Sequence, residues 1–230
     1  MRFPIIIGLC GLAGAGKDTV ADCLVTHAGF SKIAFADALR NEVAAAFNLG
    51  DQLCILTDRE TKEVPTNAMR LSRCRNLKFL SRMQDIAAKE QPDFDYDSWV
   101  AAPRSPRQIM QLWGTEYRRA MNENYWTNTV AMRILSAETT ANNRWVITDC
   151  RFANEALAIR RIGGELWQVQ RQNHTSVEGG HASQNDGSNF GPDCALLNGT
   201  TIIDLMHITL RMLQHRHGGL VLPDDLEAAA

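Results

Sequence analysis

The sequence predicts an α/β protein in which a mostly parallel, five-stranded sheet lies between two layers of helices. Two observations support this fold class. Short apolar runs rich in β-branched residues alternate with segments of helical periodicity along much of the chain. In addition, a glycine-rich loop joins the first apolar run to the first helix. Ligands of such folds bind beyond the carboxyl ends of the strands, so polar residues that follow apolar runs deserve most interest.

The N-terminal part contains two predicted strand–helix pairs. Phe3–Cys10 is a β-branched apolar run typical of a buried strand, and a helix is expected at Lys17–His27. Ser31–Ala36 is a second short strand. The helix Asp37–Phe47 follows it, with Asp37 as a suitable N-cap.

The middle of the chain, about residues 48–143, is predicted to be mainly helical. Residues 48–75 are mixed and charged, whereas Gln91–Arg104 resembles a loop and contains two prolines. Pro106 stands where the first turn of a helix accepts proline. The helices predicted here are Asn76–Glu90, Gln108–Ala120 and Trp126–Ala141.

The C-terminal part returns to alternating strands and helices. Residues 172–192 are rich in Gly, Ser, Asn and His, which predicts a mobile loop. The strands predicted here are Arg144–Asp149, Glu165–Arg171 and Cys194–Leu197, and the helices are Ala153–Ile162 and Thr201–His215.

Composition excludes several functional classes. The 230 residues carry a net charge of −2, which argues against a broad nucleic-acid-binding surface while allowing a local basic cleft. No segment approaches the ~18 apolar residues of a membrane span. Residues 8–20 resemble an export signal only superficially, since Lys17 and Asp18 interrupt the apolar run. The six cysteines lack metal-binding spacing, which favours reduced thiols in a cytosolic protein.

A phosphate-binding loop is the strongest local signal. Gly11, four further residues, Gly16 and Lys17 follow an apolar strand and open a helix. Glycines allow successive backbone N–H groups to face phosphate oxygens, and the lysine reaches the β- and γ-phosphates of a nucleotide. The residues predicted to bind ATP are Gly11, Ala13, Gly14, Ala15, Gly16, Lys17, Asp18 and Thr19.

An aspartate occupies the position after the lysine, where Ser or Thr usually binds Mg²⁺. Asp18 could bind the metal directly, hold a metal-bound water, or turn away to a basic residue while Thr19 serves the metal. We favour the metal–water role, because Mg²⁺ keeps several waters. The alternative is a carboxylate that merely stabilises the first turn of a helix.

Asp149 ends an apolar run and is a second candidate Mg²⁺ ligand, the alternative being a cap for the helix Ala153–Ile162. Arg151 lies two residues further on, and Arg171 ends the next predicted strand. Arginine forks bind phosphate oxygens bidentately, so both residues are candidates for neutralising phosphoryl groups.

Several further segments of the chain resemble a known family, the bacteriophage-type deoxynucleoside monophosphate kinases, which are relatives of adenylate kinase. The segments follow one another in the same order as in that family. The resemblance covers most of the chain. Besides the Gly-Lys-Asp-Thr of the loop, the similar segments are Phe35–Arg40, Asp58-Arg59-Glu60, Arg107–Glu116 with its Arg-x3-Gln-x2-Gly-Thr pattern, Tyr125-Trp126, Thr148–Glu155 and His181-Ala182-Ser183. Gln184 departs from the family, in which Glu is common at that position.

The resemblance implies transfer of the γ-phosphoryl group of ATP to a deoxynucleoside monophosphate, with Mg²⁺ as cofactor. Lys17, Asp149, Arg151 and Arg171 would be catalytic, and Asp18 and Asp149 would serve the metal. The residues implied to bind the acceptor are Ala36, Asp37, Arg40, Arg59, Arg107, Gln111, Thr115, Trp126, Arg151 and Glu155. Two alternatives stay open: a phosphomevalonate or dephospho-coenzyme A kinase on the same scaffold, and a non-catalytic nucleotide-binding regulator.

The resemblance also implies one P-loop kinase domain over residues 1–230. Its core would be 1–47 and 144–217, its helical monophosphate-binding insert about 48–143, its lid about 172–193 and its tail 218–230. We expect ATP and the monophosphate as partners, with neither a nucleic-acid polymer nor a membrane, and leave a homodimer open. The expected location is cytoplasmic, in the host cytoplasm if the chain is phage-encoded.

Overall fold

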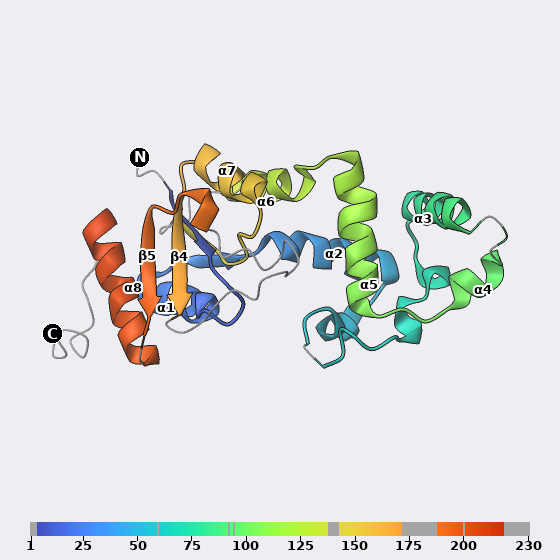
Figure 1. The fold of residues 1–230 in the computed structure, drawn as a ribbon, viewed down its shortest axis with the longest axis horizontal. Helices are drawn as coiled ribbons and strands as arrows, with labels where there is room; N and C mark the ends of the chain where they lie inside the picture. The colour runs from blue at the N-terminus through green and yellow to red at the C-terminus, as the bar shows by residue number, and fades with distance from the viewer. Residues whose placement is uncertain are drawn as a thin grey trace. The chain divides into compact units, whose positions relative to one another are not determined.

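The computed structural model describes residues 4–58, 60–91, 93, 95–137, 143–171, 188–199 and 201–218. The chain divides into two units, which are described separately (Figure 1). Unit 1 comprises Met1–Phe35 and Thr127–Ala230, and unit 2 comprises Ala36–Trp126. The predicted insert at 48–143 overlaps unit 2 for most of its length, and its limits stay a prediction.

A single parallel sheet in the order β2-β3-β1-β4-β5 forms the centre of unit 1, which confirms the predicted sheet. The central strand β1 pairs Ile5 with Arg144 on one side and Ile7 with Glu165 on the other. The strands are β1 (Ile5–Cys10), β2 (Ser31–Ile33), β3 (Arg144–Ile147), β4 (Glu165–Arg171) and β5 (Cys194–Asn198). β2 and β3 are shorter than predicted.

Helices cover both faces of this sheet, because its strands present apolar side chains to both sides. Ile7 and Leu9 pack with α1 (Lys17–Ala28) and α8 (Ile202–His217). Ile6 and Cys10 face the other layer, which consists of α7 (Ala153–Arg161) and the part of α6 (Tyr125–Ser136) in unit 1. The three predicted layers are therefore confirmed (Figure 1).

The start of α2 (Phe35–Phe47) differs from the prediction. The helix begins at Phe35, because Oδ1 of Asp149 accepts the Phe35 N–H at 2.7 Å and so caps the helix from a distant segment. Asp37 is therefore not the N-cap. Its carboxylate instead forms an ion pair with Arg40 at 2.8 Å.

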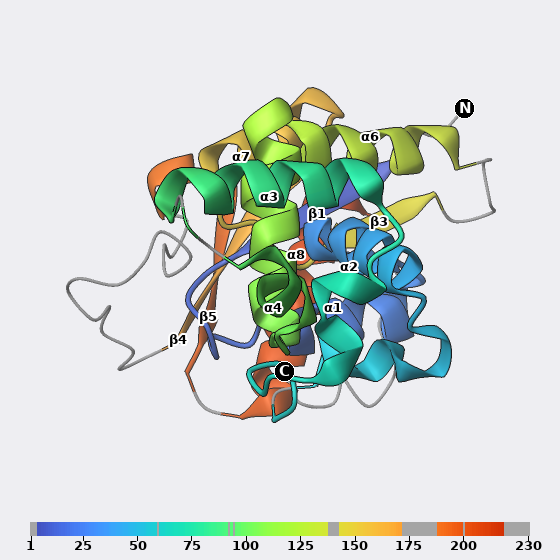
Figure 2. The same cartoon turned by 90° about the vertical axis from the view of Figure 1, so that its right-hand side faces the viewer.

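Unit 2 is helical and has a core of its own (Figure 2). Phe79 packs against Trp113 and Tyr117, with ring centroids 4.5 and 5.6 Å apart. Besides the rest of α2, its α-helices are α3 (Leu77–Glu90), α4 (Tyr96–Ala101) and α5 (Pro106–Gln111), and 3₁₀ turns lie at Gly50–Leu56, Asn67–Met69 and Leu71–Arg73.

Two predictions for unit 2 need correction. The segment Gln91–Arg104 is not all loop, because α4 forms there with Asp95 as its N-cap. The helix predicted over Gln108–Ala120 begins at Pro106, which confirms the placement of that proline in a first turn, and Ser105 and Gln108 make a reciprocal capping box there. It then widens into a π-helix at Leu112–Arg119. π-helical turns are rare and occur frequently at functional sites.

Parts of two predictions lie outside the described residues. Of the lid predicted at 172–193, only 188–193 is described, with a 3₁₀ turn at Ser188–Phe190. Of the tail at 218–230, only Gly218 is described. Within the described part of the chain, every helix is too short or too polar to cross a bilayer.

Candidate active site

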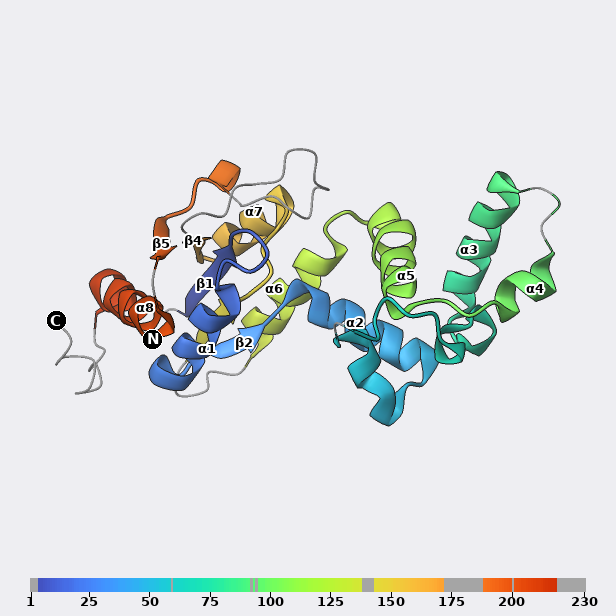
Figure 3. The same ribbon diagram turned by 60° about the horizontal axis from the view of Figure 1, so that its bottom comes forward.

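The loop between β1 and α1 has the backbone of a phosphate cradle (Figure 3). Gly11, Gly14 and Gly16 have φ values of +136°, +78° and +109°, which side-chain-bearing residues rarely adopt. A Cβ atom at Gly11 would also collide with the carbonyl oxygen of Val169 in β4. Glycine at position 11 is therefore required by both conformation and space.

Two residues at the carboxyl ends of neighbouring strands contact this loop. Asn198, at the end of β5, donates from Nδ2 to the Ala15 carbonyl at 2.9 Å. Arg171, at the end of β4, places Nη1 3.5 Å from the Gly14 carbonyl. Sequence analysis singled out Arg171 but missed Asn198, whose only signal was its place directly after the last predicted strand.

Lys17 lies at the first position of α1 and reaches back to the loop. Its ammonium donates to the carbonyl oxygens of Gly11 at 2.7 Å and Leu12 at 2.8 Å. Burial lowers the pKa of Lys17, and the positive charge of Arg151 lowers it further, against the raising effects of Asp18, Cys10 and Asp149. Lys17, Arg151 and Asp149 therefore share one electrostatic environment.

Asp149 follows β3 at the same edge of the sheet. The next residue, Cys150, donates its N–H to the carbonyl of Leu9 at 3.2 Å, which fixes the segment beside the end of β1. Because Oδ1 of Asp149 caps α2 through Phe35, its structural role differs from the predicted alternative, a cap for α7.

Glu155, and not Asp149, caps the start of α7. Its side chain is buried, and Oε2 accepts the N–H groups of Arg151 at 2.8 Å and Phe152 at 3.1 Å. Arg151 itself is exposed. Glu155 therefore holds the backbone of the residue that sequence analysis assigned to the phosphates, and its predicted contact with the acceptor stays a prediction.

Asp18 points to solvent from the first turn of α1. Its side chain is 81% exposed, and Oδ1 lies 3.8 Å from the ammonium of Lys32. Lys32 makes its shorter ion pair, at 2.9 Å, with Asp22. This geometry resembles the third arrangement considered for Asp18, in which Thr19 serves the metal. The metal role of Asp18 stays a prediction.

The predicted acceptor residues of unit 2 lie in different settings. Asp37 and Arg40 pair with each other, and Arg107 pairs with Glu63 at 2.5 Å. Ala36 opens unit 2 on α2, Gln111 and Thr115 are exposed, and Arg59 lies outside the described residues.

Trp126 differs from the other predicted acceptor residues because it is buried. It is only 3% exposed, and its indole N–H donates to Gly114 at 3.3 Å, so it belongs to the core. Its proposed contact with an acceptor gains no support from this burial.

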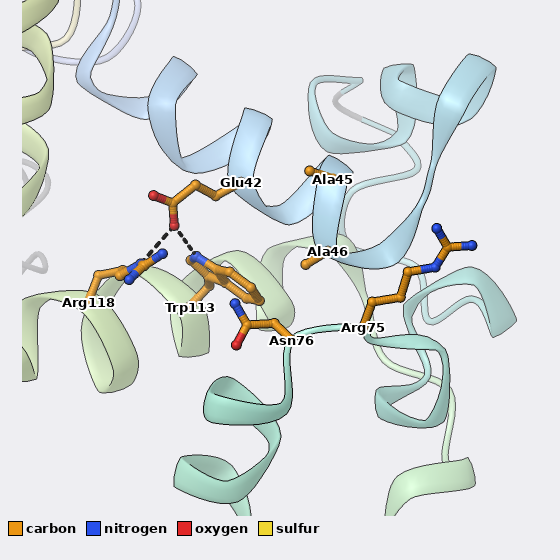
Figure 4. Close-up of a pocket in the computed structure, with 7 residues that line it drawn as sticks. All are labelled: Glu42, Ala45, Ala46, Arg75, Asn76, Trp113 and Arg118. Carbon is orange, nitrogen blue, oxygen red and sulfur yellow. Dashed lines mark hydrogen bonds and ion pairs between the residues drawn. The ribbon is translucent and has the colours of Figure 1, made fainter.

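Unit 2 also contains a pocket that sequence analysis did not anticipate (Figure 4). It measures about 330 Å³ and is lined by Glu42, Ala45, Ala46, Arg75, Asn76, Trp113 and Arg118. The carboxylate of Glu42 accepts from Trp113 Nε1 at 2.8 Å, Arg118 Nε at 2.7 Å and the Tyr125 hydroxyl at 2.5 Å. Burial and this contact with Glu42 raise the pKa of Tyr125.

Comparison with known proteins identifies the family. A sequence model described as "Deoxynucleotide monophosphate kinase" matches residues 56–209, which is more than half of the chain. The chain belongs to the deoxynucleotide monophosphate kinase family. A protein of Acanthamoeba polyphaga mimivirus named "Putative deoxynucleotide monophosphate kinase" is 26% identical over 209 residues, covering 86% of this chain and 90% of that protein.

Two solved structures are weakly similar. TT1252 from Thermus thermophilus has a TM-score of 0.44 and 16% identity, covering 95% of this chain and 100% of its own. A dephospho-CoA kinase from Campylobacter jejuni has a TM-score of 0.40 and 11% identity, covering 91% of this chain and 96% of its own.

Membership of this family makes the chain a nucleotide kinase, which is a class of phosphotransferase. Because kinases commonly use Mg²⁺, the residues that could bind a metal ion are of interest. Among the described residues, no group of three or more His, Cys, Asp or Glu side chains could hold one. Mg²⁺ in kinases needs fewer protein ligands, because it is bound by one or two side chains together with phosphate oxygens and water. Asp149, Asp18 and Thr19 supply oxygen atoms of this kind around the loop.

Proposed function

We propose that the protein transfers the γ-phosphoryl group of ATP to a deoxynucleoside monophosphate, giving a deoxynucleoside diphosphate and ADP. The observation that carries this proposal is the cradle, in which Gly11, Gly14 and Gly16 all have positive φ and Lys17 lies at the end. The cradle precedes residues 56–209, so it supports a nucleotide kinase independently of the family match.

The side chains around the cradle suit phosphoryl transfer. This reaction depends on alignment and on neutralising the charge of the phosphoryl oxygens, with little covalent chemistry by the protein. Lys17, Arg151 and Arg171 would supply positive charge, and Glu155 would keep the Arg151 backbone in place. Since the pKa of Lys17 is lowered by burial and by Arg151, anionic phosphates would relieve an unfavourable cluster of cations.

The metal would be held by Asp149 together with Thr19 or Asp18. When bound, Mg²⁺ neutralises charge on the β- and γ-phosphates. Asp149 would then both cap α2 and serve the metal, through different lone pairs of its carboxylate.

Unit 2 would bind the acceptor. The residues of unit 2 proposed for this role from the family resemblance are Ala36, Asp37, Arg40, Arg59, Arg107, Gln111, Thr115 and Trp126. Because Arg40 and Arg107 are each paired with a carboxylate, a phosphate would have to compete with Asp37 and Glu63 for them.

An ADP-release assay with ATP over a panel of acceptors tests the function. The panel contains dAMP, dCMP, dGMP, dTMP, phosphomevalonate and dephospho-coenzyme A, and labelled γ-phosphate identifies the product. We expect label to appear in at least one deoxynucleoside diphosphate and this activity to require Mg²⁺. Turnover of only phosphomevalonate or dephospho-coenzyme A would replace the proposed acceptor. ATP binding without transfer to any acceptor would favour a regulator.

A further inference from the structure

We propose that Asn198 is a positioning residue of the phosphate cradle, and that it fixes the orientation of the peptide group between Ala15 and Gly16 for nucleotide binding. This inference rests on the function proposed above, in which the cradle binds ATP. It concerns a residue that neither the loop pattern nor the family resemblance singled out. Every contact that carries it lies within unit 1.

The place of Asn198 is set by the sheet. Asn198 is the last residue of β5 and pairs with Arg171 at the end of β4. From this half-buried position its Nδ2 donates to the carbonyl oxygen of Ala15 at 2.9 Å. The two residues are 183 positions apart, so the hydrogen bond forms only when the sheet has brought the end of β5 beside the loop.

The same amide also lies against Gly16. A Cβ atom added at Gly16 would come within 2.7 Å of Asn198 Nδ2 and 3.0 Å of Leu205 Cδ2 in α8. Gly16 has a φ of +109°, which side-chain-bearing residues rarely adopt. The Asn198 amide is therefore next to both residues that share the Ala15–Gly16 peptide group.

The orientation of this peptide group decides what the loop offers to a phosphate. In a planar trans peptide, the C=O and N–H bonds point in opposite directions. Because the Ala15 carbonyl points to Asn198, the Gly16 N–H points away from Asn198. Within the described part of the chain, this N–H has no hydrogen-bond acceptor. It is therefore available to a phosphate oxygen, which is the use that phosphate-binding loops make of such groups.

Without Asn198, the opposite orientation would be accessible. Glycine tolerates both signs of φ, so Gly16 itself offers little resistance to a rotation of the peptide group before it. The rotation would turn the partly negative Ala15 oxygen toward an anionic ligand and turn the N–H away. The apparent affinity for a ligand falls with the fraction of molecules in the competent state. Asn198 thus raises the affinity for phosphates by favouring one orientation in advance.

The neutral amide of Asn198 differs from the cations at the same loop. Lys17 and Arg171 also contact carbonyl oxygens of the loop. Both are proposed to bind phosphate oxygens, so a bound nucleotide would draw them away from those carbonyls. The amide of Asn198 carries no charge and can keep its hydrogen bond to Ala15. Asn198 would therefore hold the loop in both the empty and the occupied state.

The variant Asn198→Leu tests this role, because leucine has nearly the shape of asparagine and lacks the donor. We expect the variant to bind ATP and inorganic tripolyphosphate about five- to tenfold more weakly than the wild type, measured by titration calorimetry with Mg²⁺. Tripolyphosphate has neither base nor sugar, so it reports on the phosphate site. In the kinase assay, KM for ATP should rise by the same factor, whereas kcat and the acceptor KM should change by no more than about twofold.

Gln170→Met is the matched control. It removes a similar amide from β4, at the position that pairs with Leu197, and this amide donates to Gln168. The control should bind ATP and tripolyphosphate like the wild type. Asn198→Ser repeats the test if Asn198→Leu fails to fold, because the serine hydroxyl is one bond shorter and cannot place a donor where Nδ2 lies.

Three results would overturn the role of Asn198. The first is equal binding of tripolyphosphate by the wild type and the folded variant. The second is weaker binding of ATP with unchanged binding of tripolyphosphate, because Asn198 would then contact the nucleoside instead of the loop. The third is an equal loss of affinity in Gln170→Met, which would indicate a general effect at the ends of the strands.

The binding measurements also separate this proposal from the function on which it rests. If the wild type binds ATP and tripolyphosphate but phosphorylates no deoxynucleoside monophosphate, the proposed reaction is wrong, and the comparison with Asn198→Leu still decides the role of Asn198. If the wild type binds neither ligand, both proposals are wrong.

Discussion

Replacing Lys17 with methionine should separate catalysis from stability. Methionine keeps most of the apolar stem of the side chain and removes the ammonium. The variant loses two hydrogen bonds, to the carbonyls of Gly11 at 2.7 Å and Leu12 at 2.8 Å. Hydrogen bonds of a charged donor each contribute about 1.5–3 kcal/mol to stability, so their loss alone would destabilise the fold.

The lowered pKa of Lys17 indicates that burying the charged ammonium beside Arg151 costs more than its hydrogen bonds contribute. The folded surroundings as a whole, these hydrogen bonds included, disfavour the charged amine relative to water, mainly through burial and then through Arg151. Because the lost hydrogen bonds and the relieved burial of the charge oppose each other, we expect the free energy of unfolding to change by about 1 kcal/mol, a common size for a point substitution. That corresponds to a shift of about 2–4 °C in Tm for a chain of this size.

Catalysis should respond much more strongly. Loss of one preorganised charge at a transition state costs about 10²–10³ in rate, equivalent to about 3–4 kcal/mol in the activation barrier. The assay is ADP release with the best acceptor of the panel, together with thermal unfolding of both proteins. Turnover near the wild-type rate in folded Lys17→Met would refute the assignment of Lys17 to the phosphates.

The pH dependence of unfolding provides a second check on the same residue. Because the folded pKa of Lys17 lies below the unfolded pKa, the unfolded chain binds more protons between these two values. The contribution of Lys17 to stability therefore rises with pH across that window. Lys17→Met should lack this rise, and an identical pH profile in the two proteins would contradict the lowered pKa.

Three further predictions concern the same loop and its surroundings. Arg151→Lys keeps the positive charge and the backbone hydrogen bond to Glu155, but it loses the bidentate guanidinium fork. We therefore expect kcat to fall about tenfold or more while Tm stays constant. Unchanged kinetics would make Arg151 a surface residue. Asp18→Asn should raise the Mg²⁺ concentration needed for half-maximal rate more than it raises the acceptor KM. A magnesium titration at fixed ATP measures this. An unchanged magnesium requirement would leave Asp18 as an exposed charge at the start of a helix. Gly11→Ala should destabilise the fold by about 3 kcal/mol or more, because it combines unfavourable φ with the collision at Val169, and a variant that melts like the wild type would show that the loop relaxes.

Much of unit 1 was predictable because its signals are local. A buried parallel strand needs a continuous apolar run, a covering helix needs an apolar stripe, and the cradle needs glycines at positive φ before the lysine. Each of these requirements concerns a few consecutive residues. Sequence therefore determined the strands, the helices beside them, the cradle and the candidate charges Lys17, Asp149 and Arg151.

Long-range contacts decided the rest. Asp149 caps α2 at Phe35, 114 residues away, and Asn198 supports the loop at Ala15, 183 residues away. The carboxylate of Glu42 accepts hydrogen bonds from side chains 71 to 83 residues further along the chain. Trp126 is buried in the core of the same unit. A side chain finds such a partner only after sheet register and helix packing bring the two segments together, so no local pattern specifies it. Sequence alone thus identified candidate groups for phosphate chemistry, whereas tertiary structure decided which of their neighbours hold the backbone around them.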